Sequence, residues 1–215
     1  MFRTFLWKSL HNTHKIGNYW DNIENYSHHG LCTKCRVTEN LEHILLECDI
    51  PGQRVVWKNV KELWLKKHEN WPEPINIGTI TGCGLIEVKS REGTVLKGES
   101  RAYQILISAS AHLIWKLRCT RIYSDKPDDE WPENPEIQNR WLATINSWLL
   151  LDRSSTSQHY GKKATKQKTV LETWKNLLKD EDKLPKNWLK SSGVLVGVNQ
   201  MDPHCGMPDN PDEPP

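Results

Sequence analysis

The sequence predicts a mainly α-helical protein, with a small cysteine-rich module of a knuckle and a helix followed by a helical bundle. Apolar residues recur at helical spacing in several segments, whereas the alternating runs typical of strands are scarce. The chain is otherwise polar, with 37% hydrophobic residues and a mean hydropathy of −0.69. Its eleven tryptophans supply large side chains for a core.

Residues 1–68 are predicted to form the N-terminal module. Its first helix spans residues 2–12 and places Phe2, Phe5, Leu6 and Leu10 on one side. A second helix is predicted to open at Pro51, because proline is favoured in the first turn. The apolar stripe of this helix is Val56, Val60, Leu63 and Trp64.

Prolines and glycines punctuate residues 69–96, so we expect a linker there, with a short strand near residues 85–88. Residues 97–198 are predicted to be the helical C-terminal region. It contains a long helix over about residues 99–123, a helix capped by Asn134 with Pro135 in its first turn, and a last helix around Val170–Leu178. Residues 193–198 predict a short strand, and the acidic, proline-rich residues 199–215 predict disorder.

A metal-binding pattern stands inside the N-terminal module. Cys32, Cys35, His43 and Cys48 follow the order Cys-x2-Cys-x7-His-x4-Cys. Two close ligand pairs separated by a short turn are typical of a four-coordinate zinc site. The protein fills all four ligand positions, so the predicted Zn²⁺ is structural and not catalytic.

The second ligand pair raises a geometric question. His43 and Cys48 are five positions apart, a spacing that places them on different faces of a regular α-helix. We therefore expect Cys48 to lie at a frayed or distorted helix end. The alternatives are three buried reduced thiols with a surface histidine, or replacement of a ligand by His28 or His29.

The residues around this pattern resemble a known family. The runs FLWKSLHNTHKIGNYW, CTKC and ENLEHILLEC are similar to the zinc-binding domain that follows reverse transcriptase or ribonuclease H domains in non-LTR retroelement proteins. The matching positions are Trp7, Lys8, Leu10, His11, Asn12, Gly17, Cys32, Cys35, Glu39, His43 and Cys48. Further runs up to about residue 199 resemble the C-terminal region of fungal retroelement proteins.

The resemblance implies an accessory region of a retroelement protein whose partner is RNA or DNA. The sequence holds no polymerase signature and none of the spaced carboxylates of a ribonuclease H domain. We therefore expect no enzymatic activity, and we expect the catalytic domains to be missing from this chain. Asp128, Asp129 and Glu130 are adjacent in sequence, so they cannot all converge on one pair of metal ions, and a solvated acidic loop is the better interpretation.

Two basic clusters are the predicted contacts to phosphates. Lys162, Lys163, Lys166 and Lys168 stand together without an acidic residue, and Lys116, Arg118 and Arg121 follow one another on the predicted long helix. Lysine–phosphate contacts give affinity without sequence preference. For the first cluster the alternative is an exposed loop that leads into a helix, and the sequence does not show whether the two clusters share a face.

Most tryptophans fall on helical apolar stripes and are expected in the core, whereas Trp20 and Trp71 lie off such stripes and are candidates for base stacking. The net charge of +2 is too small to indicate nucleic-acid binding by itself.

No signal peptide or membrane span is evident, so we expect an intracellular, reducing location, nucleus or cytoplasm, with Cys83, Cys119 and Cys205 as free thiols. The predicted function is a non-catalytic, zinc-stabilised nucleic-acid-binding region. The alternatives are a structural or protein-interaction remnant, or a fragment of a ribonuclease H or polymerase enzyme.

Overall fold

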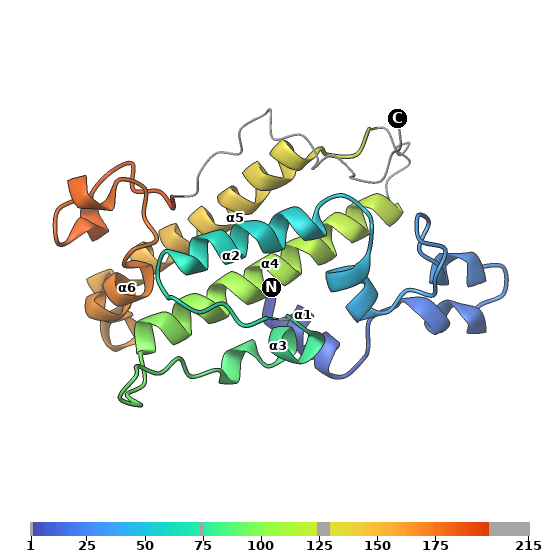
Figure 1. Ribbon diagram of the computed structural model, residues 1–215, viewed down its shortest axis with the longest axis horizontal. Helices are drawn as coiled ribbons and strands as arrows, with labels where there is room; N and C mark the ends of the chain where they lie inside the picture. The colour runs from blue at the N-terminus through green and yellow to red at the C-terminus, as the bar shows by residue number, and fades with distance from the viewer. Residues whose placement is uncertain (1, 74, 124–129, 198–215) are drawn as a thin grey trace, which may run out of the picture.

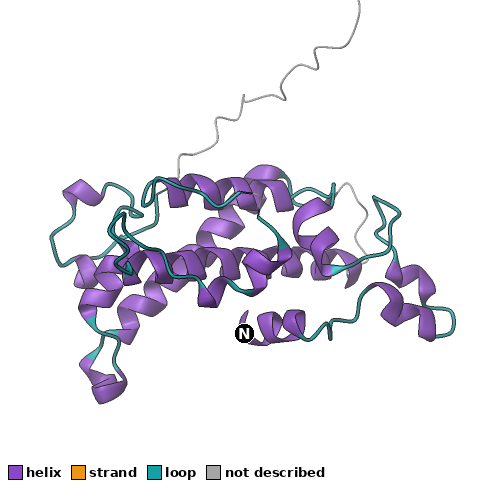
Figure 2. Cartoon of the chain, turned by 60° about the horizontal axis from the view of Figure 1, so that its bottom comes forward, coloured by secondary structure: helices purple, strands orange, loops and turns teal. Residues whose placement is uncertain are grey.

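The computed structural model describes residues 2–73, 75–123 and 130–197, and it is mainly helical (Figures 1 and 2). The longest helix, α4 (Lys97–Tyr123), runs through the molecule, and α2 (Gln53–Leu65) and α5 (Asn134–Ser155) pack against it and against each other. The predicted fold class is confirmed. In the described ranges, pairing between extended segments is confined to single bridges, Leu31 with Thr38, Lys89 with Val95 and Leu178 with Val196.

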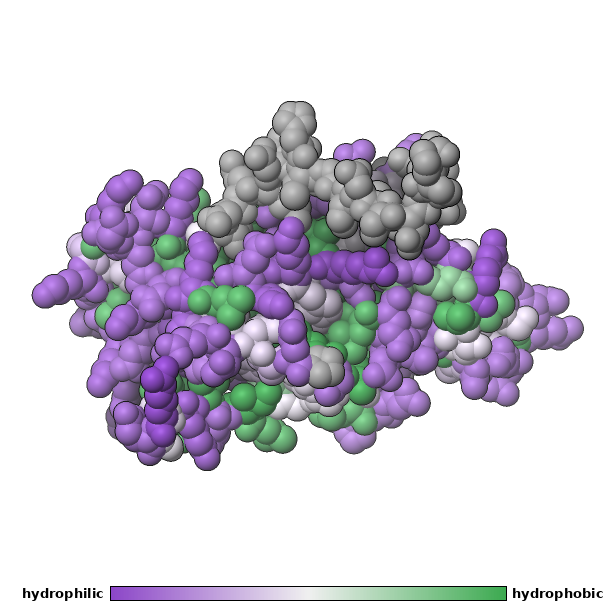
Figure 3. All heavy atoms as spheres, viewed as in Figure 1, coloured by the Kyte–Doolittle hydropathy of each residue, from purple (hydrophilic) through white to green (hydrophobic). Residues whose placement is uncertain are grey.

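Shorter helices cover α4. α1 (Phe2–Leu10) and α3 (Ile77–Thr81) contact it on one side, and α6 (Gln167–Trp174) packs against its first turn, where Gly98 meets the backbone of Glu172. The remaining turns are η1 (Gly17–Asn22), η2 (Ser27–Gly30), η3 (His43–Glu47), η4 (Cys83–Leu85), η6 (Gln158–Lys163), η7 (Glu181–Lys183) and η8 (Trp188–Lys190). On the face in Figure 3 most side chains are hydrophilic, and apolar ones gather over the lower middle, where α1 and α3 lie.

One hydrophobic core joins the N-terminal module to the C-terminal helices. Val60 and Trp64 of α2 belong to the same buried cluster as Trp141 of α5 and Trp174 of α6. The predicted limits at residues 68 and 97 therefore do not coincide with a break in the packing. Among the described residues, none of the helices combines the length and the apolar character needed to cross a membrane.

The segment predicted as a linker, residues 69–96, differs from the expectation. It contains α3 and η4, and Ile80 and Cys83 are fully or almost fully buried. Its prolines and glycines do mark turns, but the apolar residues between them pack into the core. The expected strand near 85–88 is reduced to the bridge at Lys89.

Other predicted boundaries shift by a few residues. α2 begins at Gln53 and not at Pro51, because Gly52 has a φ of 123° that ends the preceding turn. Glu133, one residue before the predicted cap, is the N-cap of α5. α6 ends at Trp174, although Leu177 and Leu178 beyond it are buried. The predicted strand at 193–198 pairs only through Val196, and residues 199–215 lie outside the described part.

A buried charge network fastens the three C-terminal helices together. Asp152 of α5 is 2% exposed and accepts hydrogen bonds from both terminal nitrogens of Arg101 of α4, at 2.5 and 2.6 Å, and from the indole N–H of Trp174 of α6, at 2.8 Å. Because the carboxylate is satisfied on both oxygens, its burial is compensated.

Candidate metal centre

Cys32 and Cys35 lie on a tight turn between two short extended segments. The Cys32 amide donates to the Val37 carbonyl at 2.8 Å, and the Arg36 amide donates to the Cys32 carbonyl at 2.9 Å. Arg36 closes the turn with a positive φ of 58°. The Cys35 amide points at the Cys32 sulfur, 3.4 Å away. An amide directed at a sulfur stabilises a thiolate there.

His43 and Cys48 are brought together by a turn of π-helix. Asn40 caps the helix, because its side-chain oxygen accepts from the His43 amide at 2.8 Å. The chain then widens into η3, and the Cys48 amide donates to the His43 carbonyl, five residues back, at 2.8 Å. Cys48 itself is extended. The expected distortion at Cys48 is confirmed, and a π turn has the five-residue step that aligns these two ligands.

The four side chains converge. Their potential ligand atoms all lie within 4.8 Å of one another. The Cys48 sulfur is 3.7 Å from that of Cys32 and 4.0 Å from that of Cys35, and all three cysteines are free. In a tetrahedral zinc site with Zn–S bonds of about 2.3 Å, two sulfurs lie about 3.8 Å apart. The cluster could therefore hold a metal ion, and its sulfur–sulfur distances are consistent with zinc.

His43 provides an independent test of the fit. Its Nε2 atom is buried and has no hydrogen-bond partner within the described chain. A buried ring nitrogen without a partner is costly, and a metal would satisfy it. Its other nitrogen, Nδ1, lies 3.9 Å from the Glu47 carboxylate. A carboxylate beside the second nitrogen is a common arrangement around metal-binding histidines.

The sulfurs have opposite tendencies in the absence of a cation. Burial raises the pKa of Cys32, but the Cys35 amide and then the His43 side chain lower it, and the balance brings it to about 7. Burial raises the pKa of Cys48 to about 12, and the nearby Cys32 and Cys35 sulfurs add to this rise. Three sulfurs this close cannot all be thiolates without a cation between them, which is the charge that a divalent metal supplies.

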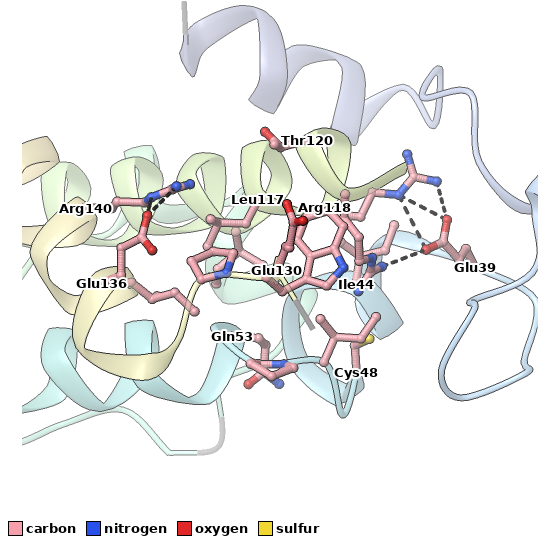
Figure 4. A pocket seen from close by; sticks show the side chains of 17 residues that line it. Glu39, Ile44, Cys48, Gln53, Leu117, Arg118, Thr120, Glu130, Glu136 and Arg140 are labelled. Carbon is pink, nitrogen blue, oxygen red and sulfur yellow. Dashed lines mark hydrogen bonds and ion pairs between the residues drawn. The ribbon is translucent and has the colours of Figure 1, made fainter. Parts of the chain in front are cut away.

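A buried ion pair ties the knuckle to α4. Glu39 lies between the two ligand pairs in sequence, and its carboxylate accepts from Nε of Arg118 at 3.1 Å and from a terminal nitrogen of the same guanidinium (Figure 4). Arg121 adds a contact at 3.9 Å. The exposed fractions of the three side chains are 1% for Glu39, 5% for Arg118 and 8% for Arg121. The pair therefore fixes the position of residues 32–48, the metal segment, on α4.

α2 holds the other side of the same segment. The Trp57 indole donates to the Leu45 carbonyl at 2.7 Å, and the Gln53 amide donates to the Leu46 carbonyl. Widening a helix into a π turn frees carbonyl groups, and these two side chains satisfy two of them.

A cavity of about 210 Å³ lies between the metal segment, the end of α4 and the start of α5 (Figure 4). Cys48 and Ile44 form part of its wall. Two sets of its charged side chains pair with each other, Arg118 and Arg121 with Glu39, and Arg140 with Glu136 at 2.6 Å. These internal pairs leave little net charge to attract an ionic ligand.

The two predicted basic clusters are placed differently. Lys162 and Lys163 of η6, Lys166 just before α6 and Lys168 in its first turn are all exposed, and Lys168 lies 3.7 Å from Glu172. On α4, Lys116 is exposed, but Arg118 and Arg121 are buried against Glu39. The second cluster thus does not form a free basic surface, because a buried carboxylate takes two of its members. Asp128 and Asp129 lie outside the described residues.

The sequence alone did not indicate that Glu39 pairs with these arginines, although Glu39 is one of the positions that match the resembled family.

No protein-family model, curated protein or solved structure matches this chain.

Proposed function

We propose that this chain is a non-catalytic nucleic-acid-binding region of a retroelement protein, stabilised by one Zn²⁺ on Cys32, Cys35, His43 and Cys48. The observation that carries the proposal is the closed Cys₃His cluster, whose ligand atoms lie within 4.8 Å of one another. The retroelement assignment comes from the sequence resemblance around these ligands.

The surroundings of the cluster support a structural metal. The four residues complete a tetrahedral shell, so substrate would have to displace a ligand. Glu39, Gln53 and Trp57 attach the metal segment to α4 and α2. The ion would hold the knuckle against the π turn and thereby fix the turns η1 and η2 that precede it. Catalysis would belong to other domains.

The lysine segment supports the nucleic-acid part. Lys162, Lys163 and Lys166 are exposed, and they take part in none of the ion pairs among the described residues. Exposed ammonium groups of this kind neutralise phosphates and release counterions. RNA and DNA are both suitable partners, because the backbone phosphates are common to the two.

A binding titration tests this function. A fluorescein-labelled single-stranded oligonucleotide of about twelve residues, as RNA and as DNA, is titrated with zinc-loaded protein at low salt, and the anisotropy is recorded. The proposal expects binding of both, weakened steeply by salt. In parallel, an RNA–DNA hybrid incubated with Mg²⁺ or Mn²⁺ is expected to stay intact. Absence of binding to either oligonucleotide would reject the nucleic-acid function, and cleavage of the hybrid would reject the non-catalytic one.

A second candidate is a protein-interaction module. Leu150 and Leu151 of α5 are 61% and 59% exposed, and Leu195 is 49% exposed. The Val196 amide donates to Asn146 of α5, so the segment of Leu195 lies along the same helix. Adjacent exposed leucines favour a partner protein. Self-association that disappears on Leu150→Ser and Leu151→Ser, measured by sedimentation, would support this reading.

A further inference from the structure

The residues before the second ligand pair form a lobe at one end of the molecule. It comprises residues 17–39, and in Figures 1 and 2 it projects away from the helical core. η1 and η2 lie side by side in it, followed by the cysteine knuckle. The lobe has few aliphatic side chains and an unusual number of rings, listed as Tyr19, Trp20, Tyr26, His28 and His29.

These rings form one connected cluster. Trp20 and Tyr26 are nearly parallel, with centroids 6.2 Å apart and planes at 25°, and Tyr26 and His29 are 5.5 Å apart at 22°. Tyr19 meets Trp20 edge-on at 5.2 Å. The Trp20 indole donates to the Lys15 carbonyl at 3.1 Å. The contacts between the rings, and this hydrogen bond for Trp20, restrain their orientations.

Two rings of the cluster are open to solvent, unlike the aromatic residues of the core, and Trp20 and His29 are half-buried beside them. Tyr19 is 41% and Tyr26 is 49% exposed, whereas Trp64, Trp141 and Trp174 are at most 2% exposed. Core rings gain their stability by being covered. Rings held rigidly and left half open provide aromatic faces on which a planar group can stack at a small entropic cost.

The charges beside the cluster indicate which planar group. Lys15 lies over the Tyr19 ring, 5.5 Å from its centroid, and Lys34 and Arg36 are exposed on the knuckle. Asp21 and Glu24 are also exposed, so the positive and negative charges beside the rings nearly balance. A phosphate-binding surface would need more positive charge. Aromatic rings with a few flanking cations are typical of sites that stack unpaired bases.

We propose that Tyr19, Trp20, Tyr26 and His29 form a stacking platform for the unpaired bases of a single-stranded nucleic acid. The proposal rests on the nucleic-acid function proposed above and adds strand preference to it. A duplex buries its base faces in its own stack, so it would engage the exposed lysines but not the rings.

The zinc site and the platform are mechanically linked. Gly17 begins η1, and a Cβ at this position would lie 2.2 Å from the Glu39 carbonyl; a Cβ at Gly30 would lie 2.7 Å from the Gly17 carbonyl. The Glu39 amide donates to the Gly30 carbonyl at 2.8 Å. The ring-bearing turns thus sit directly on the knuckle, so removing the metal should remove the platform.

The test compares a fluorescein-labelled oligothymidylate of about twelve residues with a duplex of the same length, by anisotropy. Tyr19→Ala and Tyr26→Ala are each expected to weaken single-strand binding about five- to tenfold, at the low end for loss of one stacked base, and to leave duplex binding unchanged. Tyr26→Phe keeps the ring and should bind as the wild type does. Trp7→Ala removes a ring that is 56% exposed on α1, and it is the matched control. Zinc content confirms that each variant keeps its lobe.

Photocrosslinking of the unaltered protein gives a second readout that needs no variant. An oligonucleotide carrying 5-iodouracil reacts on irradiation with an aromatic side chain stacked on it. After trypsin digestion the crosslink is expected on the peptide of residues 16–34, which ends at Lys34.

The outcomes separate the two proposals. If neither single strand nor duplex binds, the proposed function itself fails. If both bind equally, and the alanine variants match the wild type, only the stacking platform is rejected. A crosslink confined to the peptide with Trp71, residues 68–89, would also reject it.

Discussion

Glu39 and Arg118 are 79 positions apart in the sequence and form a buried ion pair, with Arg118 Nε 3.1 Å from the carboxylate. Glu39 follows the cysteine knuckle and Arg118 lies in the last third of α4, so the pair joins the knuckle to the longest helix. Burial alone would lower the pKa of Arg118, but the Glu39 carboxylate raises it, and the guanidinium stays charged.

Breaking this pair should be costly. Glu39→Gln leaves Arg118 and Arg121 without a carboxylate in a buried site, which is expected to lower the free energy of unfolding by about 3–5 kcal/mol. Urea unfolding of the zinc-loaded protein measures it. The matched control is Arg54→Gln, which breaks an exposed pair with Asp49 and should cost less than about 1 kcal/mol. Equal costs for the two variants would show that the buried pair does not fasten the knuckle.

Substitutions at Gly17 and Gly93 distinguish the cost of backbone strain from the cost of a steric clash. Both have a positive φ, 52° and 82°, but a Cβ at Gly17 would lie 2.2 Å from the Glu39 carbonyl, whereas nothing lies within 4 Å of one at Gly93. Gly93→Ala is expected to cost about 1–2 kcal/mol from the left-handed conformation alone. Gly17→Ala should cost more and also weaken zinc retention against a chelator. If Gly17→Ala retains zinc as the wild type does, the close contact between Gly17 and the knuckle at Glu39 is not needed for the metal site.

The fold and the candidate metal cluster were largely predictable because both leave local signals. The ligand order indicated the site, the five-residue step from His43 to Cys48 indicated a distorted helix, and the periodicity over residues 99–123 indicated α4. The π turn itself could not be predicted, because a helix that ends regularly and a helix that widens into a π turn have the same sequence pattern. Its stabilising contacts come from Gln53 and Trp57 on another helix.

Long-range pairing explains most of what the sequence did not show. Arg118 and Arg121 have the spacing of a solvated basic face, and only the fold places Glu39 against them. The same holds for Arg101 and Asp152, 51 positions apart. Residues 69–96 were predicted as a linker from their prolines and glycines, yet Ile80 is fully buried, because a turn-rich segment can still carry core residues.

The lysine segment should govern the salt dependence of nucleic-acid binding. If about four phosphates are neutralised, the slope of log affinity against log salt should be near −3 to −4. Changing Lys162, Lys163, Lys166 and Lys168 to Ser should flatten this slope by a similar amount and leave the zinc content unchanged. Lys116→Ser on α4 is the single-lysine control. Binding that does not respond to salt, or to the fourfold change, would favour the protein-interaction candidate.

Two histidines near α1 predict a loss of stability in mild acid. Burial is the main cause that lowers the pKa of His14 and of His112 below 6.5; Lys8 and Arg118 also lower that of His14, and Lys116 that of His112. The unfolded chain therefore binds more protons than the folded one as the pH falls through 6.5, so this contribution to stability is present above that pH and is lost below it.

The measurement is the free energy of unfolding at pH 7.5 and pH 5.5 for the wild type and for the double variant His14→Gln, His112→Gln. Because acid also weakens metal binding in both proteins, the informative quantity is the difference between them. The wild type is expected to lose more stability than the variant. Identical losses would mean that these rings are not held neutral in the folded protein.

The central claim is that Cys32, Cys35, His43 and Cys48 hold one structural zinc ion. Native mass spectrometry of protein purified under reducing conditions tests it most directly, with Cys35→Ser as the ligand variant and Cys83→Ser, a buried cysteine outside the cluster, as the control. The account predicts one zinc per chain in the wild type and in Cys83→Ser, and a strongly reduced zinc content in Cys35→Ser. A wild-type chain that carries no metal after this purification, and takes up none when zinc is supplied, would contradict it.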